Sequence, residues 1–216
     1  MAPTTSSAVP AGSPVEWAVT GQRLFSWLRA GLQLSERIVP RWAPALAARA
    51  FCTPLAGRHP PARLDPPPGV RMQQLAFERR ALTTYQWPAA GDAPAVLLTH
   101  GWCGWGLQMA PLAQALQQAG WAPWVLDMPA HGRSDGRSST LVQFVRALHH
   151  VVACTPAIQA VVAHSMGGGA ACIAAASGLP VNRLVLIAPH LDVEQLAGQW
   201  VAAFGLSDAT RCAILR

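Results

Sequence analysis

The sequence of 216 residues contains no lysine and few charged side chains of any kind. All sixteen basic residues are arginine, and charged residues make up 12% of the chain, about half the share in an average soluble protein. Ten arginines and four acids lie in residues 1–80, whereas residues 81–216 carry six of each. The formal charge of +6 therefore belongs to the N-terminal part. No nucleic-acid-binding motif accompanies it, so we expect no nucleic-acid partner.

Long apolar runs and secretion signals are also missing. No stretch reaches the roughly 18 apolar residues that a membrane-spanning helix needs, and the first residues lack a basic segment followed by an apolar one. The five cysteines have neither paired nor metal-like spacing, which favours reduced thiols and no bound metal or cofactor. Cys154 and Cys172 fall in apolar stretches and are predicted to be buried. These features are typical of a cytoplasmic protein.

The N-terminal third differs in character from the rest. Residues 1–14 contain proline and serine and predict a disordered leader. Residues 15–69 predict a helical segment, broken at Pro40, and then a proline-rich linker. Five arginines are spread along the helical part. They fit either a basic amphipathic helix on an anionic membrane surface or, as we favour, a helix packed on the core of the protein.

Residues 70–216 alternate between strand and helix patterns and predict one domain. Short apolar runs alternate with longer segments of helical spacing. The predicted strands are residues 72–78, 81–87, 95–99, 122–127, 158–162 and 181–188, and the predicted helices are about 107–119, 138–152, 169–176 and 193–216. The first two strands are expected to form a hairpin. This alternation indicates an α/β fold with a doubly wound, mostly parallel sheet.

Three short motifs follow predicted strands. Residues 163–168 (AHSMGG) have the form of a nucleophile elbow, in which a serine stands on a tight turn between a strand and a helix. The motif HGWCG occupies residues 100–104, and DMPAHGRSDG occupies residues 127–136. Because parallel strands end at the same edge of a sheet, all three motifs are expected at the carboxyl edge, where such folds bind ligands.

With these motifs in this order, residues 70–216 resemble the α/β-hydrolases, most of all bacterial members with a serine nucleophile and esterase- or lipase-like activity. The resemblance implies that Ser165 attacks carboxylic esters and forms an acyl-enzyme. It implies an oxyanion hole made of the backbone N–H groups of Met166 and Trp102. No metal or cofactor is implied. Structural roles at the site fall to His100, Gly101, Gly167, Asp127 and His131.

The triad acid and base are not evident. In the α/β-hydrolases they follow the serine, in loops after a seventh and an eighth strand. Only 51 residues follow Ser165, and they contain one histidine, His190, and a sixth strand but no seventh. We therefore expect a domain that lacks the last strands of the fold, with the acid and base lost by truncation. The alternative is a rebuilt site with His190 as base and Asp192 or Asp127 as its partner.

Two classes of function follow from this. The first is a serine hydrolase of small carboxylic esters. The second is a catalytically inactive remnant of the hydrolase fold that acts as a binding or membrane-surface module. In both cases the strand at 181–188 is expected to form an exposed apolar edge, through which copies of the chain could associate.

Overall fold

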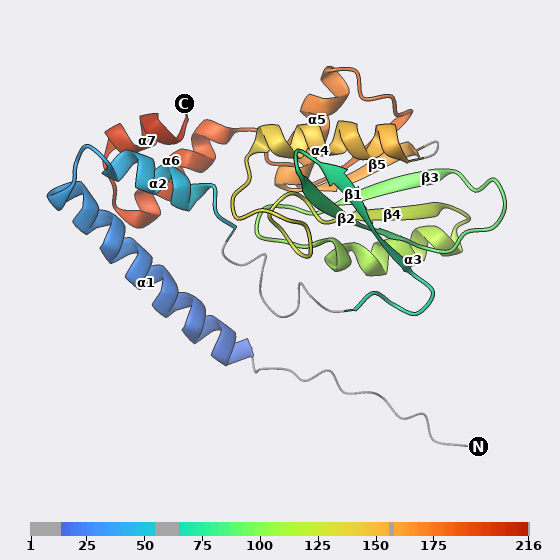
Figure 1. Ribbon diagram of the computed structural model, residues 1–216, viewed down its shortest axis with the longest axis horizontal. Helices are drawn as coiled ribbons and strands as arrows, with labels where there is room; N and C mark the ends of the chain where they lie inside the picture. The colour runs from blue at the N-terminus through green and yellow to red at the C-terminus, as the bar shows by residue number, and fades with distance from the viewer. Residues whose placement is uncertain (1–13, 55–64, 156–157, 216) are drawn as a thin grey trace, which may run out of the picture. The chain divides into compact units, whose positions relative to one another are not determined.

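The computed structural model describes residues 14–54, 65–155 and 158–215 (Figure 1). Contacts divide the chain into two compact units: residues 1–48 with 194–216, and residues 49–193. This division differs from the predicted boundaries after residues 14 and 69. The predicted disordered leader lies outside the described residues, apart from Pro14.

The first unit is helical. Its elements are α1 (Pro14–Ile38), most of α2 (Ala43–Phe51), α6 (Val193–Phe204) and α7 (Asp208–Ile214). The ring of Phe204 lies 4.6 Å from that of Phe25 on α1, between centroids, and stacks on Trp200. The C-terminal helices therefore share a core with α1, which is why they separate from the predicted domain at 70–216. No helix in the described part combines the length and hydropathy needed to cross a bilayer.

The second unit contains a six-stranded sheet in the order β1-β2-β4-β3-β5-β6. The strands are β1 (Arg71–Phe77), β2 (Arg80–Gln86), β3 (Ala95–Thr99), β4 (Ala122–Leu126), β5 (Ile158–His164) and β6 (Arg183–Ile187). The pairs β1–β2 and β2–β4 are antiparallel, and the remaining pairs are parallel. The hairpin turn has positive φ at both central residues, Glu78 and Arg79, which suits the twist of the flanking strands.

Helices cover both faces of this sheet (Figure 1). On one face lie α4 (Leu141–Cys154) and α5 (Met166–Ala176); on the other lies α3 (Ala110–Gln118), preceded by a 3₁₀ turn at Gly106–Met109. Strand β3 alternates between the two cores, since Leu97 packs with the first and Val96 and Leu98 with the second. The predicted doubly wound, mostly parallel α/β fold is confirmed.

Two side-chain predictions have different outcomes. Cys154 is exposed and Cys172 half-buried, so their predicted burial is wrong. The buried positions of α4 run from Phe144 to Val152, and Cys154 lies beyond them in the last turn. By contrast, β6 forms the expected exposed apolar edge: it pairs with β5 alone, and Val185 is 51% exposed.

Candidate active site

Ser165 occupies the turn between β5 and α5. Its φ of 52° and ψ of −122° lie in a region that residues other than glycine seldom adopt. Its N–H donates to the carbonyl oxygen of Ile187 in β6, and its own carbonyl oxygen accepts from the N–H groups of His190 and Gly169. The strained turn is therefore held by the neighbouring strand and by the first turn of the helix. This is the elbow geometry that the AHSMGG motif predicts.

Two glycines bring the loop after β3 against this turn. A Cβ atom at Gly101 would lie 2.7 Å from the Cβ and 3.1 Å from the Oγ of Ser165. A Cβ atom at Gly167 would overlap the carbonyl oxygen of His100. Carbon atoms do not approach non-bonded atoms this closely in a packed interior, so any other residue at either position would push the two loops apart.

Backbone donors remain available beside the serine. Met166 is the first residue of α5, so its N–H has no acceptor within the helix, and the helix dipole favours an anion there. The N–H of Trp102 has no backbone acceptor in the part of the chain that the structure describes. An oxyanion that formed next to Ser165 could accept hydrogen bonds from donors of this kind.

His100 is fully buried and braces the loop. Its Nε2 accepts from the N–H of Met128 at 3.0 Å, so the proton resides on Nδ1, which donates to the carbonyl oxygen of Gly101 at 2.7 Å. Burial, with the nearby His131 as a smaller contribution, lowers the pKa of His100 to about 3. The imidazole is therefore neutral at physiological pH. Its Nδ1 bonds within the loop after β3, and its Nε2 joins that loop to the loop after β4.

Asp127 organises the loop after β4. Its buried carboxylate accepts from the hydroxyl of Tyr85 at 2.9 Å and from the backbone N–H groups of Gly106 and Arg133. Burial raises its pKa to about 6, although these hydrogen bonds act in the opposite direction. Ser134 ties this loop to β2, because its hydroxyl donates to the carbonyl oxygen of Asp127 and accepts from the N–H of Thr83.

His131 and Trp102 link the same loops through their rings. Nε2 of His131 accepts from the N–H of Cys103, so Nδ1 donates to the carbonyl oxygen of Pro129. The Trp102 ring packs edge-on against that of His131, with 4.9 Å between centroids, and lies near Phe144. The Trp102 side chain is therefore anchored to the core, which fixes the backbone that carries its N–H.

The loop after β6 reaches the elbow from the other side. The N–H of His190 donates to the carbonyl oxygen of Ser165 at 3.0 Å, and the carbonyl oxygen of His190 lies where a Cβ atom at Gly169 would stand. Nε2 of His190 is buried without a hydrogen-bond partner within the described ranges. The fold thus brings the backbone of His190 to Ser165, but no hydrogen bond between described residues joins its ring to that serine. Asp192 lies two residues further along.

Tyr85 is the site residue that the sequence patterns missed. It is the only tyrosine of the chain, it is fully buried, and burial, followed by the adjacent carboxylate of Asp127, raises its pKa. The sequence signal that could have pointed to it was its place on a predicted strand. Its partner Asp127 lies 42 residues away along the chain, so no local pattern links the two.

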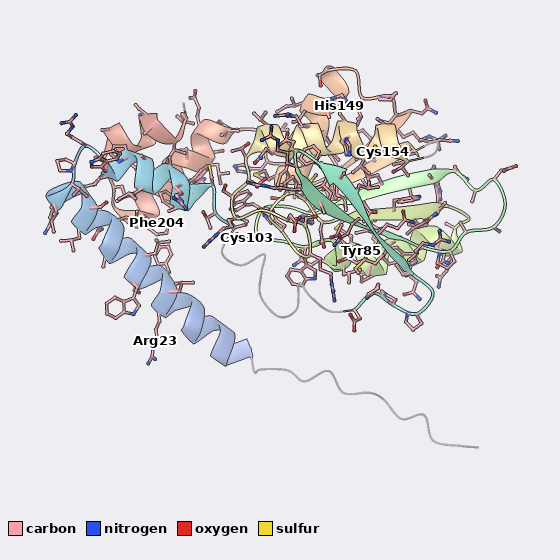
Figure 2. All side chains as sticks on the ribbon, viewed as in Figure 1. Arg23, Tyr85, Cys103, His149, Cys154 and Phe204 are labelled. Carbon is pink, nitrogen blue, oxygen red and sulfur yellow. The ribbon has the colours of Figure 1, made fainter. Side chains whose placement is uncertain are left out.

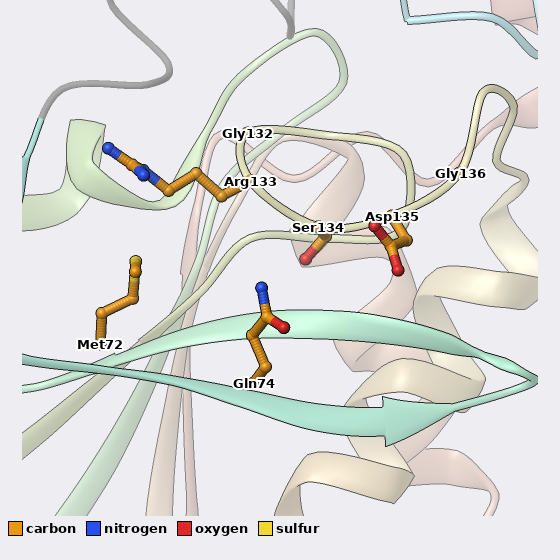
Figure 3. A pocket seen from close by; sticks show the side chains of 7 residues that line it. All are labelled: Met72, Gln74, Gly132, Arg133, Ser134, Asp135 and Gly136. Carbon is orange, nitrogen blue, oxygen red and sulfur yellow. The ribbon is translucent and has the colours of Figure 1, made fainter.

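A surface hollow of about 470 Å³ lies between β1 and the loop after β4 (Figure 3). Met72 and Gln74 of β1 line one side, and residues 132–136 of the loop after β4 line the other. Ser165 does not line it. No group of His, Cys, Asp and Glu in the described part is arranged to hold a metal ion.

The fold and the elbow define a doubly wound α/β protein with a serine on a strained strand-to-helix turn. A family model described as alpha/beta hydrolase fold matches residues 94–206, which is more than half of the chain. The chain therefore belongs to the α/β-hydrolase family. No curated protein sequence matches it significantly.

Solved structures show the same fold at low sequence identity. The thioesterase domain from the curacin biosynthetic pathway is 24% identical with a TM-score of 0.52, over 65% of this chain and 54% of that one. The N-acyl homoserine lactonase AidH is 18% identical with a TM-score of 0.52, over 60% and 49%. A deformylase from Pseudomonas putida S16 is 20% identical with a TM-score of 0.50, over 55% and 47%. The chain thus spans about half the length of these proteins.

Proposed function

We propose that this chain is a serine hydrolase of carboxylic esters with Ser165 as its nucleophile. The observation that carries the proposal is the strained Ser165 turn, with φ 52°, placed at the start of α5 and against the loop of Gly101. Such strain persists where the surrounding structure imposes it, and it exposes a serine side chain to substrate. The similar thioesterase, lactonase and deformylase structures support only the fold, so the ester substrate rests on the elbow itself.

The proposed chemistry is acyl transfer through a covalent intermediate. Oγ of Ser165 bonds to the ester carbonyl carbon, its proton passes to a base, and the carbonyl electron pair moves to the oxygen. The N–H groups of Met166 and Trp102 stabilise this oxyanion. Collapse breaks the bond to the alcohol, which leaves with the proton from the base. Water then attacks the acyl-enzyme along the same route and releases the carboxylic acid.

His190 is the base in this proposal. Its backbone is hydrogen-bonded to Ser165, and its buried Nε2 has no hydrogen-bond partner among the described residues, so it is free to accept a proton. Asp127 is a poor choice for the orienting acid, because its carboxylate already accepts three hydrogen bonds. Asp192 is the nearer choice in sequence. Since no hydrogen bond holds the His190 ring against Oγ, we expect slow turnover, at most about 10³ to 10⁴ above the reaction in water.

A second candidate is an inactive member of the family that binds without catalysis. It is favoured by one observation: within the described part of the chain, no hydrogen bond connects Oγ of Ser165 to an imidazole. A mass measurement after treatment with a fluorophosphonate separates the candidates, because the probe adds covalently only to an activated serine.

The full chain should gain one phosphonyl group and hydrolyse p-nitrophenyl butyrate slowly, and Ser165→Ala should lose both properties. Ser138→Ala, on the surface loop before α4, is the control and should retain both. Loss of turnover in His190→Ala, with turnover kept in His164→Ala, supports His190 as base. Labelling or turnover that survives Ser165→Ala contradicts the proposal, and the absence of both from the unaltered chain favours the inactive candidate.

A further inference from the structure

Helix α1 carries a second apolar face that has no partner among the described residues of its unit. Its inner face packs on α6 through the ring of Phe25, and Leu32 further along α1 is buried. On the inner side as well, the amide of Gln33 donates to the carbonyl oxygen of Phe204. Four other apolar side chains of α1, at Leu24, Trp27, Leu34 and Ile38, lie on a different side of the helix and are exposed.

These residues form what we call the outer stripe, defined as Leu24, Trp27, Gly31, Leu34 and Ile38. They recur at alternating steps of three and four residues, which places them on one face of a helix. Trp27 is 77% exposed and Ile38 is 68% exposed. Nothing lies within 4 Å of a Cβ atom built at Gly31, so the middle of the stripe is open. Trp42, in the turn after α1, extends the apolar surface and is 69% exposed.

The charges near the outer stripe have one sign. Arg23 and Arg37 on α1 and Arg41 in the following turn are exposed, and Arg23 extends outward from the helix (Figure 2). No salt bridge engages any of the three among the described residues. The single acid of residues 23–48 is Glu36, and its carboxylate is turned toward α7, where it accepts hydrogen bonds from Ser207 and Thr210.

We propose that the outer stripe docks on an anionic lipid surface. Tryptophan prefers the boundary between lipid headgroups and acyl chains, and arginine extends its guanidinium group toward phosphate while its stem covers apolar surface. An amphipathic helix with this combination lies in the plane of the interface. The same charges disfavour a second copy of the chain as occupant, because a symmetric pair would bring arginines together with no carboxylate to meet them.

The test is co-sedimentation of the full chain with vesicles. Binding to vesicles that contain phosphatidylserine should exceed binding to pure phosphatidylcholine and should fall as salt is raised. The variant R23Q/R37Q/R41Q should bind the anionic vesicles at least about tenfold more weakly, since each arginine near such a surface contributes about a fivefold factor. The matched control R71Q/R137Q/R183Q removes the same charge from exposed positions of the second unit and should bind as the unaltered chain does.

The apolar contribution needs its own pair of variants. W27Q/W42Q should weaken vesicle binding by about tenfold, whereas V142Q/I173Q, which changes exposed apolar residues of the second unit, should not. Equal binding to neutral and anionic vesicles, or equal losses in both charge variants, would overturn the proposal. A lipid-free dimer in analytical ultracentrifugation that W27Q/W42Q dissociates would overturn it as well, because a second copy would then be the occupant.

Discussion

The loops after β3 and β4 and the loop after β6 approach Ser165 from opposite sides of β5, and they differ in how fully their polar groups are bonded. In the first pair of loops, both nitrogens of His100 and both oxygens of Asp127 have partners. In the loop after β6, the Nε2 atom of His190 is buried without one among the described residues. The side of the site that would hold an oxyanion is thus pre-organised, whereas the side that would move a proton lacks an orienting contact.

This difference bears on both candidate functions. A pre-organised set of donors lowers the barrier to acyl transfer without further rearrangement. Proton transfer needs a base within hydrogen-bond distance of Oγ, held in one tautomer by a second group. The comparison therefore predicts that substitutions in the first loops cost stability, and that substitutions at His190 cost little stability but remove whatever turnover exists.

The largest expected effect on stability is that of Asp127→Ala. The change leaves the hydroxyl of Tyr85 and two backbone N–H groups buried without their acceptor, which should lower the free energy of unfolding by about 4 kcal/mol at pH 7.5. Denaturant unfolding measures it, with Asp92→Ala in an exposed turn as the control. A loss below about 1 kcal/mol would show that the loop does not depend on this carboxylate.

His100→Gln should give a smaller loss whose size depends on pH. The pKa of His100 is about 3 in the folded chain and about 6.5 in an unfolded one, so the unfolded state binds this proton first as pH falls. The stability that neutral His100 contributes is therefore complete above pH 6.5 and is lost between pH 6.5 and 3. The advantage of the natural chain over the variant, about 2 kcal/mol at pH 7.5, should shrink by about 1.4 kcal/mol for each pH unit below 6.5, reach zero at about pH 5 and reverse in sign below that. A difference that is constant from pH 7.5 to 4.5 would contradict this account of His100.

The smallest expected effect on stability is that of His190→Ala. The Nε2 atom of its ring makes no hydrogen bond in the described structure, so the change should alter the free energy of unfolding by less than about 1 kcal/mol. The same denaturant titration, run beside Asp127→Ala, checks it. A loss as large as that of Asp127→Ala would mean that the two sides of the site are equally well bonded, and the comparison above would fail.

Much of the second unit was predictable because its signals are local. Apolar runs of strand length, separated by segments of helical spacing, predicted every strand to within a few residues. The elbow at 163–168 was predictable because a small residue on one side and Gly167 on the other are what a sharp turn at Ser165 requires. The resemblance to α/β-hydrolases added the family, and the family match over residues 94–206 agrees with it.

The first unit was less predictable for a physical reason. The spacing of apolar residues in α1 indicates a helix, but α1 has two apolar faces, and the sequence does not say which of them meets a partner. Phe25 and Leu32 pack within the unit, while Trp27 and Ile38 remain exposed. Nor does the sequence say that α6 and α7 group with α1, since that choice depends on contacts between residues more than 170 positions apart.

The sequence by itself determined the order of strands and helices, the turn at Ser165 and the excess of arginine in the N-terminal part, because each depends on neighbouring residues or on composition. Tertiary structure alone decided that Tyr85 meets Asp127, that both nitrogens of His100 are engaged, and that the His190 ring has no hydrogen bond to Ser165 among the described residues. These depend on distances between side chains far apart in the chain, and such distances are set only when the sheet closes and the loops at its edge pack against one another.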